Sequence, residues 1–283
     1  MKVAVASSST IINETSGVNT FIHHLRTCLE KHGHELEVTT EEHNYQHGSD
    51  IYIANDAYSF VFANGKNIIN VNHMGDVLGV MHTPDKVDYP REYIFDYLNK
   101  QVSFEGTNVS LHNSFKAGLT KLGIETDVIP LPFYPSEYTM PEHKEGIIMV
   151  GAGWPRKQLH KAIELIPADI PVTLLSSAEL ILPDNWTQKV LPNSQVTNEI
   201  AKHKMLFLPS CIEVYPYVLL ESVAVTRAVV MPHFWNEGLP YDKVSSTSEL
   251  VALYDQGYEP PFDICEYSLK AERAWLDLLT NLV

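Results

Sequence analysis

The sequence predicts an α/β protein built from two parallel-sheet halves, and three observations support this prediction. The chain has 283 residues, of which 45% are hydrophobic, so it can bury a sizeable core in two domains of ordinary size. Short apolar runs alternate with helical patterns along the whole chain, as in parallel sheets covered by helices. The alternation is interrupted at residues 130–145, where prolines and the charged run from Glu142 to Glu145 indicate a linker.

Each element of the first half follows from this alternation. Helical periodicity predicts a helix at residues 18–31. A second helix should open at Asn113-Ser114, which are typical N-cap residues, and close at Gly123. Apolar runs predict strands at residues 3–6, 35–39, 50–54, 67–71, 108–111 and 127–131.

The same pattern restarts after the linker. Helices are predicted at residues 157–166, at 196–203 and from Pro216 onward, and an amphipathic helix at 267–282. Strands are predicted at residues 147–150, 172–175, 189–191, 205–208 and 228–231. We therefore expect a Rossmann-like N-terminal domain over residues 1–138, a Rossmann-like C-terminal domain over 139–264, and a C-terminal helix over 265–283 that packs on either domain.

Charge and cysteine content exclude several classes of protein. The formal net charge of −15 argues against a wholesale basic surface for nucleic acid or anionic membrane. Cys28, Cys211 and Cys265 are odd in number and far apart, which makes a disulfide framework or a zinc site improbable. The first apolar run is too short for a signal peptide and no apolar run reaches membrane-spanning length. We expect a cytoplasmic protein without a membrane span.

The stretch "EVYPYVLLE", from Glu213 to Glu221, places a carboxylate where an aliphatic residue would be expected. Glu221 lies between apolar runs, and an ionised carboxylate removed from water is unfavourable unless a partner satisfies it. That partner is either another group of the protein or a ligand. Glu213 is expected in the loop after the preceding strand, so that both carboxylates line one site.

Two glycine-containing loops also follow predicted strands. Gly17 begins the first helix within "SSSTIINETSGVNTFIHHL", and such a helix start is a natural place for phosphate. Arg156 and Lys157 begin the helix of "IIMVGAGWPRKQLHKAIELI", where positive side chains oppose the helix dipole unless an anion binds. Taken alone, the first loop is also compatible with a glycine that merely eases entry into a helix. The second is also compatible with two solvated basic residues.

Together these stretches resemble the retaining GT-B glycosyltransferases of family 4. "EVYPYVLLESVAVTRAVV" resembles their E-x7-E signature, and "VTNEIAKHKMLFLPSCIE" resembles the helix and strand that precede it. "GIIMVGAGWPRKQLHKAIEL" is similar to their V-G-R-L-x-x-x-K-G loop, and "SGVNTFIHHLRTCLEKHGHEL" to their N-terminal G-G-V motif. The four regions occur in the family's order and cover both halves, so the joint match is more specific than any single piece.

The resemblance implies a GT-B fold and a site for a nucleotide-diphosphate sugar, with a UDP-sugar as the expected donor. The N-terminal domain would be the acceptor side and the C-terminal domain would bind the donor. Glu221 would accept hydrogen bonds from the nucleotide ribose and Glu213 would face the transferred sugar. Lys157, with Arg156, would hold the diphosphate.

Five further residues complete the implied site. Gly17 would approach the diphosphate from the N-terminal domain, and His73 in "INVNHMGD" falls where the family often carries a histidine near the sugar and acceptor. Ser210 belongs to the P-S-x-x-E element, and backbone amides near Tyr217 and Val218 would add helix-end donors. The resemblance implies no cofactor, and the sequence has no D-x-D motif for a metal, so we expect metal-independent transfer with retention.

The chain also departs from the family pattern. Ala152 stands where the family has an arginine, so Arg156 would have to supply that charge. Ser16 replaces the first glycine of the N-terminal motif, and Thr226-Arg227 replaces the glycine before the last strand. These departures leave open a catalytically degenerate module that binds a nucleotide sugar or a protein partner. An epimerase or a phosphorylase on the same fold is a further alternative.

The acceptor is a hydroxyl compound whose identity the sequence leaves open. "GVNTF" and the segment "MPHFWNEGLPY" loosely resemble phage glucosyltransferases that modify DNA bases, which makes hydroxymethylated DNA one candidate acceptor. The net charge of −15 counts against duplex DNA, because DNA binding normally uses Lys and Arg contacts to phosphate. Lipid, glycan and small-molecule acceptors remain alternatives.

Overall fold

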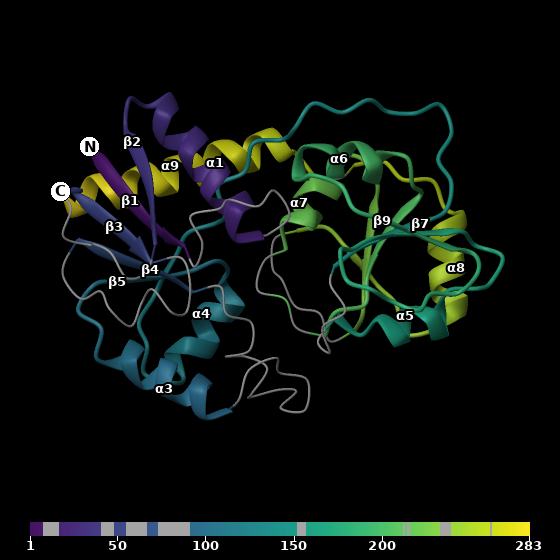
Figure 1. Ribbon diagram of the computed structural model, residues 1–283, viewed down its shortest axis with the longest axis horizontal. Helices are drawn as coiled ribbons and strands as arrows, with labels where there is room; N and C mark the ends of the chain where they lie inside the picture. The colour runs from purple at the N-terminus through teal and green to yellow at the C-terminus, as the bar shows by residue number, and fades with distance from the viewer. Residues whose placement is uncertain are drawn as a thin grey trace. The chain divides into compact units, whose positions relative to one another are not determined.

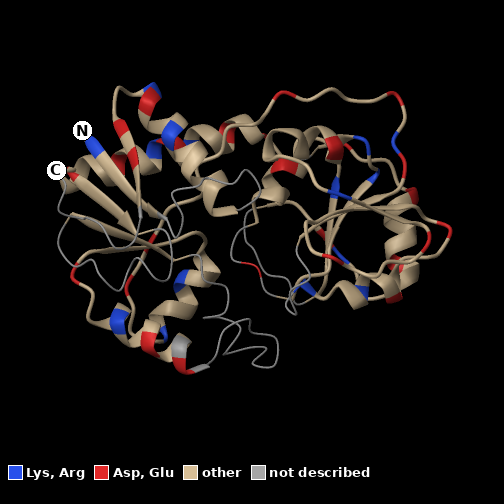
Figure 2. Ribbon diagram, in the orientation of Figure 1, with Lys and Arg blue, Asp and Glu red and all other residues tan. Residues whose placement is uncertain are grey.

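The computed structural model describes residues 1–7, 17–40, 48–54, 67–72, 91–151, 157–211, 213, 216–232, 239–260 and 262–283. These residues form two compact units (Figure 1). The first unit holds the described residues up to Tyr134 together with Cys265–Val283, and the second holds those of Pro135–Ile264. Lys and Arg positions are interspersed with Asp and Glu positions along the ribbon of both units (Figure 2). No helix of the described residues is both long and apolar enough to cross a membrane.

The first unit contains a six-stranded parallel sheet in the order β2-β1-β3-β4-β5-β6. Its strands are β1 (Lys2–Ser7), β2 (Glu35–Thr40), β3 (Ile51–Ala54), β4 (Ile68–Asn72), β5 (Thr107–Ser110) and β6 (Asp127–Val128). Its helices are α1 (Gly17–Lys31), α3 (Arg91–Val102), α4 (Asn113–Thr120) and α9 (Ile264–Leu282). The strand order reverses between β1 and β3, and ligands of such sheets bind beyond the carboxyl ends of the strands at a reversal of this kind.

The C-terminal helix α9 packs on the first unit, beside α1 (Figure 1). The rings of Phe21 in α1 and Trp275 in α9 meet edge to face, with centroids 5.6 Å apart. Trp275 is fully buried, and its indole N–H donates to the Pro130 carbonyl at 2.9 Å. The aromatic pair supplies a large apolar contact, and the hydrogen bond satisfies the one polar group of the indole.

A polar cluster around Glu272 reinforces this packing. The Glu272 carboxylate binds Lys31 Nζ and His32 Nε2, each at 2.8 Å, and accepts a hydrogen bond from the Tyr134 hydroxyl at 2.6 Å. Burial alone would raise the pKa of Glu272, but the hydrogen bonds from Lys31, Tyr134 and His32 lower it to about 2. The carboxylate therefore links α9 to α1 and to Tyr134, the last residue of the first unit before the linker segment.

Replacing Glu272 by Gln is expected to destabilise the protein by about 2–3 kcal/mol at pH 7, because the amide cannot satisfy three donors at once. Glu266→Gln is the matched control on the same helix. Its partner Lys270 and Glu266 itself are exposed, so a change within about 0.5 kcal/mol is expected. Urea unfolding measures both variants, and equal stability of the two would contradict the prediction.

The second unit contains a six-stranded parallel sheet in the order β12-β11-β10-β7-β8-β9. Its strands are β7 (Ile147–Val150), β8 (Val172–Leu175), β9 (Trp186–Lys189), β10 (Met205–Leu208), β11 (Arg227–Val230) and β12 (Asp242–Lys243). Its helices are α5 (Leu159–Leu165), α6 (Asn193–Ala201), α7 (Tyr217–Ser222) and α8 (Thr247–Asp255). This is the strand order of dinucleotide-binding Rossmann domains, and it reverses between β7 and β10.

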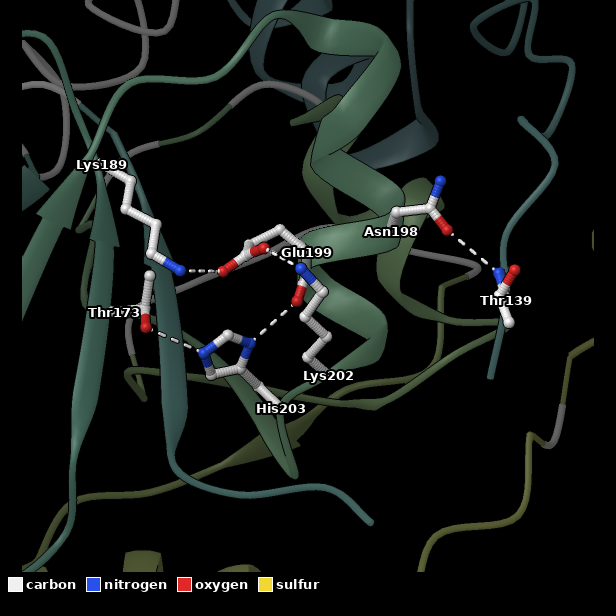
Figure 3. A network of polar contacts seen from close by, with 7 residues as sticks. All are labelled: Thr139, Thr173, Lys189, Asn198, Glu199, Lys202 and His203. Carbon is white, nitrogen blue, oxygen red and sulfur yellow. Dashed lines mark hydrogen bonds and ion pairs between the residues drawn. The ribbon is translucent and has the colours of Figure 1, made fainter. Parts of the chain in front are cut away.

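Figure 3 shows a polar network that holds α6 against this sheet. The Glu199 carboxylate binds Lys189 Nζ at 2.5 Å and Lys202 Nζ at 2.6 Å, and these hydrogen bonds hold its pKa below the usual value although burial alone would raise it. The His203 ring lies between the Glu199 carbonyl, at 2.8 Å, and the Thr173 hydroxyl, at 2.9 Å. Each of these contacts joins two groups of the protein, so we assign the network a structural role.

The side chain of Asn198 in α6 binds two backbone groups of the linker (Figure 3). Its side-chain oxygen accepts from the Thr139 N–H at 3.0 Å, and its amide donates to the Glu137 carbonyl at 3.3 Å. One side chain therefore pairs with the linker as a neighbouring strand would, which fixes this part of the linker to the second unit.

The prediction of two parallel sheets covered by helices is confirmed, with local corrections. Strand β6 has only two residues instead of residues 127–131, since Pro130 has no N–H to continue the ladder. Strand β9 begins at Trp186, earlier than the predicted 189–191, because Trp186 pairs with Val172 and its side chain is buried. Helix α4 is capped by His112, whose Nδ1 accepts from the Phe115 N–H, and not by Asn113-Ser114.

Candidate functional site

Two oppositely charged residues meet where the strand order of the second unit reverses. Strands β7 and β10 are adjacent and parallel, with Ile147 paired to Met205, so both end at the same edge of the sheet. Lys157 follows β7 and Glu213 follows β10, and their side chains form an ion pair between Nζ and Oε1. The side chains are only 19% and 9% exposed, so the pair is largely shielded from water. The structure brings these two predicted site residues together.

Gly151 shapes the position of Lys157. It directly follows β7 with φ of 154°, a conformation that L side chains rarely adopt, and its N–H donates to the Leu175 carbonyl at 3.1 Å. A Cβ on Gly151 would lie 3.5 Å from Cδ of Lys157, so the lysine stem runs directly alongside the glycine. The ammonium is thereby directed toward the end of β10.

Glu221 lies in the last turn of α7, between the fully buried Leu220 and Ser222. Its side chain is partly exposed, and burial raises the pKa of its carboxyl to about 7. Among the residues that the structure describes, the Glu221 side chain has no hydrogen-bond or ion-pair partner. A carboxylate in this state gains stability from any ligand that offers hydroxyl donors.

The other predicted donor residues of the second unit lie close to this pair along the chain. Ser210 is buried in the loop after β10, and Tyr217 and Val218 form the first turn of α7, which has no side-chain cap. Because α7 has only six residues, its dipole is small. Arg156 and Ala152 lie outside the described residues.

In the first unit, helix α1 begins at Gly17, as the sequence predicts. Gly17 is exposed, and a Cβ added to it would meet no atom within 4 Å of the described structure. The described residues therefore do not themselves require glycine at this position. His73 and Ser16 lie outside the described residues.

Sequence reasoning missed a buried polar network on β4 and β5. Asn70 donates to the Asn108 oxygen at 2.8 Å, and Asn72 accepts from the Gln101 amide at 2.6 Å and from the Tyr97 hydroxyl at 3.3 Å. All five side chains are buried, and the Gln101 oxygen has no partner within the described structure. The signal was present in the sequence, since asparagine is depleted in strands and recurs in "INVN" and "TNVS".

Comparison with solved structures places this arrangement in a known fold. The chain is similar to Anabaena HepE, solved in complex with UDP and glucose, with a TM-score of 0.65 and 13% identity over 99% of this chain and 95% of that one. This chain has the GT-B fold of glycosyltransferases. The predicted fold class is therefore confirmed.

Other GT-B structures match along most of their length. Sucrose-phosphate synthase from Thermosynechococcus elongatus has a TM-score of 0.64 at 13% identity, covering 100% of this chain and 90% of that one. The β-glucosyltransferase of phage T4 in complex with UDP-glucose has a TM-score of 0.59 at 11% identity, covering 100% and 96%. No family model matches the sequence, and no curated protein matches it. The GT-B fold thus rests on structure, at identities too low to assign an activity.

Proposed function

We propose that this chain is a retaining glycosyltransferase of the family 4 type, which moves a sugar from a UDP-sugar to a hydroxyl acceptor. The observation that carries the proposal is the pairing of Lys157 with Glu213 at the strand-order reversal of the second unit. A cation and a carboxylate at that place suit a diphosphate and a sugar, respectively. Glu221, with a raised pKa and no partner within the described structure, fits the third part of the donor, the ribose.

In this proposal each residue has a defined contact. Lys157 binds the diphosphate and stabilises the negative charge that develops on it as the sugar departs. Glu213 accepts hydrogen bonds from the hydroxyls of the transferred sugar, and Glu221 accepts them from the ribose. Arg156 is proposed to add positive charge to the phosphate site, and His73 is proposed to contact the sugar and the acceptor. The acceptor attacks on the face from which the diphosphate leaves, so the configuration of the anomeric carbon is retained.

The donor is proposed to be a UDP-sugar because similar structures were solved with UDP or UDP-glucose. Ser210 and the backbone amides of Tyr217 and Val218, which follow β10 along the chain, are proposed to complete the donor site. Charge stabilisation by Lys157 and Arg156 replaces a metal ion in this scheme, since the sequence offers no D-x-D motif. No cofactor is required.

Activity is accordingly expected to survive metal removal. Transfer should proceed at the same rate after dialysis against EDTA as before, because the protein supplies the positive charge. The measurement is UDP release with and without chelator, followed by titration of Mn²⁺ or Mg²⁺. A loss of activity that either metal restores would contradict the metal-independent scheme.

Gly17→Ala is expected to weaken donor binding without destabilising the fold. The new methyl group meets nothing in the described structure and Ala favours a helix, so unfolding free energy should stay within about 1 kcal/mol of wild type. A phosphate close to the Gly17 backbone would be displaced by that methyl, which raises KM for the donor. Gly257→Ala, also in open space, is the control and should change neither quantity. An unchanged KM in Gly17→Ala would remove Gly17 from the donor site.

The acceptor is tested as part of the same proposal. Hydroxymethylated DNA is one candidate, supported by the structural likeness to the phage T4 DNA-modifying enzyme, which has a TM-score of 0.53. The net charge of −15 and the scattered Lys and Arg positions along the ribbon of Figure 2 favour a glycan, lipid or small-molecule acceptor instead. Binding to duplex DNA at low salt distinguishes the two classes.

The decisive assay is transfer from radiolabelled UDP-glucose, UDP-galactose and UDP-N-acetylglucosamine to a panel of these acceptors. Labelled product that retains the donor's anomeric configuration by NMR supports the proposal, and an inverted product would overturn the retaining mechanism. Binding of a UDP-sugar without transfer to any acceptor would favour the catalytically degenerate module. The substitutions at Ala152 and Ser16 motivate that alternative.

A further inference from the structure

The ion pair of the second unit joins two residues that the proposed function assigns to different parts of the donor. Lys157 is assigned to the diphosphate and Glu213 to the sugar, yet in the structure each binds the other. Both side chains are largely buried, so the pair lies in an environment where charge interactions are stronger than in water. A diphosphate that binds Lys157 must therefore compete with the Glu213 carboxylate.

We propose that Glu213 determines specificity by disfavouring the spent nucleoside diphosphate relative to the intact nucleotide sugar. This inference rests on the proposed function. In the absence of a sugar, Glu213 holds the ammonium of Lys157 and repels the terminal phosphate. The intact donor relieves both effects, because its sugar hydroxyls hydrogen-bond to the carboxylate and its terminal phosphate carries less charge.

The geometry of Lys157 makes the competition direct. Its stem runs alongside Gly151, and its ammonium binds Glu213 beyond the carboxyl ends of β7 and β10. A phosphate bound there shares the ammonium with Glu213 or displaces it. Displacement separates a carboxylate that is 9% exposed from its cation, and separating a largely buried ion pair is unfavourable.

Two possible roles of Glu213 predict different effects of its removal on UDP binding. If the carboxylate only bound sugar, its removal would weaken the UDP-sugar and leave UDP unchanged. If it also competes for Lys157, its removal tightens UDP binding. UMP serves as an internal reference, because it lacks the phosphate that would compete for Lys157.

Calorimetric titration of UDP, UMP and UDP-glucose into wild type and Glu213→Gln tests the inference. Glu213→Gln is expected to bind UDP about fivefold more tightly than wild type, to bind UMP equally, and to lose preference for UDP-glucose over UDP. Glu164→Gln is the matched control, since it removes the same charge from an exposed pair with Lys161 in the same unit. It should leave all three affinities unchanged.

A second variant protects the test against misfolding. Glu213→Ser removes the carboxylate with a smaller side chain and should tighten UDP binding in the same direction. Adding Lys157→Met to either variant should abolish the gain. Equal or weaker UDP binding by folded Glu213 variants, with UDP still binding to wild type, would overturn this inference alone. Absence of binding by all three nucleotides to every variant would overturn the proposed function together with it.

Discussion

Glu221→Gln is expected to stabilise the ligand-free protein at pH 8 and to abolish its stabilisation by UDP. Burial raises the pKa of Glu221 to about 7, from an ordinary value of 4.5. Between these two values the folded protein holds a proton that the unfolded chain has released, so stability falls as pH rises through this window. Above pH 7 the folded protein carries a desolvated carboxylate that the neutral amide of Gln avoids.

The expected gain at pH 8 is about 1–3 kcal/mol, the lower figures allowing for partial exposure of the side chain. At pH 5 the wild-type carboxyl is protonated in the fold, so the two proteins should differ little. In the presence of UDP at about 100 times its dissociation constant, wild type should gain roughly 2.7 kcal/mol and the variant almost none. Thermal unfolding at both pH values, with and without UDP, measures all of these quantities.

Two outcomes would contradict this account of Glu221. A variant that is less stable than wild type at pH 8 would mean that the carboxylate is satisfied within the protein. A variant that UDP stabilises as strongly as wild type would remove Glu221 from the ribose site. The combination expected here, greater stability with lost binding, is characteristic of a residue kept for a ligand.

The first unit is expected to lose stability steeply as pH falls below 6.5, and His24→Asn should remove most of that loss. His24 is buried in α1 against Phe133, and its Nδ1 accepts from the Tyr134 N–H at 3.2 Å. Burial, with a smaller effect of His23, lowers the pKa of His24 to about 3. In this pH range His24 is protonated in the unfolded chain but neutral in the folded unit. Stability is therefore lost as pH falls from 6.5 toward 3.

The expected slope is about 1.4 kcal/mol per pH unit between pH 6 and 4.5. Glu272 adds to the loss only below 4.5, because its pKa is lowered to about 2. Asn keeps an oxygen that can accept from the Tyr134 N–H, so His24→Asn removes the titration while retaining an acceptor. Its stability at pH 7 will be lower because the ring no longer fills its place in the core.

Hydrogen exchange can assign this loss of stability at low pH to the first or the second unit. Amides of β1 and β3 should lose protection between pH 6 and 4.5 in wild type and keep it in His24→Asn, after correction for the pH dependence of intrinsic exchange. Amides of β10 serve as the reference for the second unit. The interpretation of His24 would be wrong if wild type and variant lost protection in β1 and β3 equally.

The elements that the sequence predicted best are those with strong local signals. Apolar runs such as β1 and β10 identify buried parallel strands, and Gly123 closes α4 with φ of 78°. Helix α8 also carried such a signal that was overlooked, a capping box in which Ser246 accepts from the Glu249 N–H at 3.3 Å. Strand β9 was misplaced because its register depends on the burial of Trp186, a tertiary effect.

Part of the candidate site was also predictable from a local sequence signal. Glu221 stood out because a carboxylate inside an apolar run contradicts the local pattern. The pairing of Lys157 with Glu213 was not predictable from local sequence, since it depends on β10 lying beside β7 in the sheet. The network of Asn72, Asn108 and Gln101 also joins strands and a helix that are distant in sequence.

The central claim is that the carboxyl ends of β7 and β10 bind a nucleotide sugar, and hydrogen exchange with and without UDP-glucose tests it most directly. We expect slower exchange at Gly151, around Lys157 and from Ser210 to Glu221, and no such change in Glu221→Ala. Unchanged exchange in these segments at saturating UDP-glucose, or protection that persists in Glu221→Ala, would contradict the account.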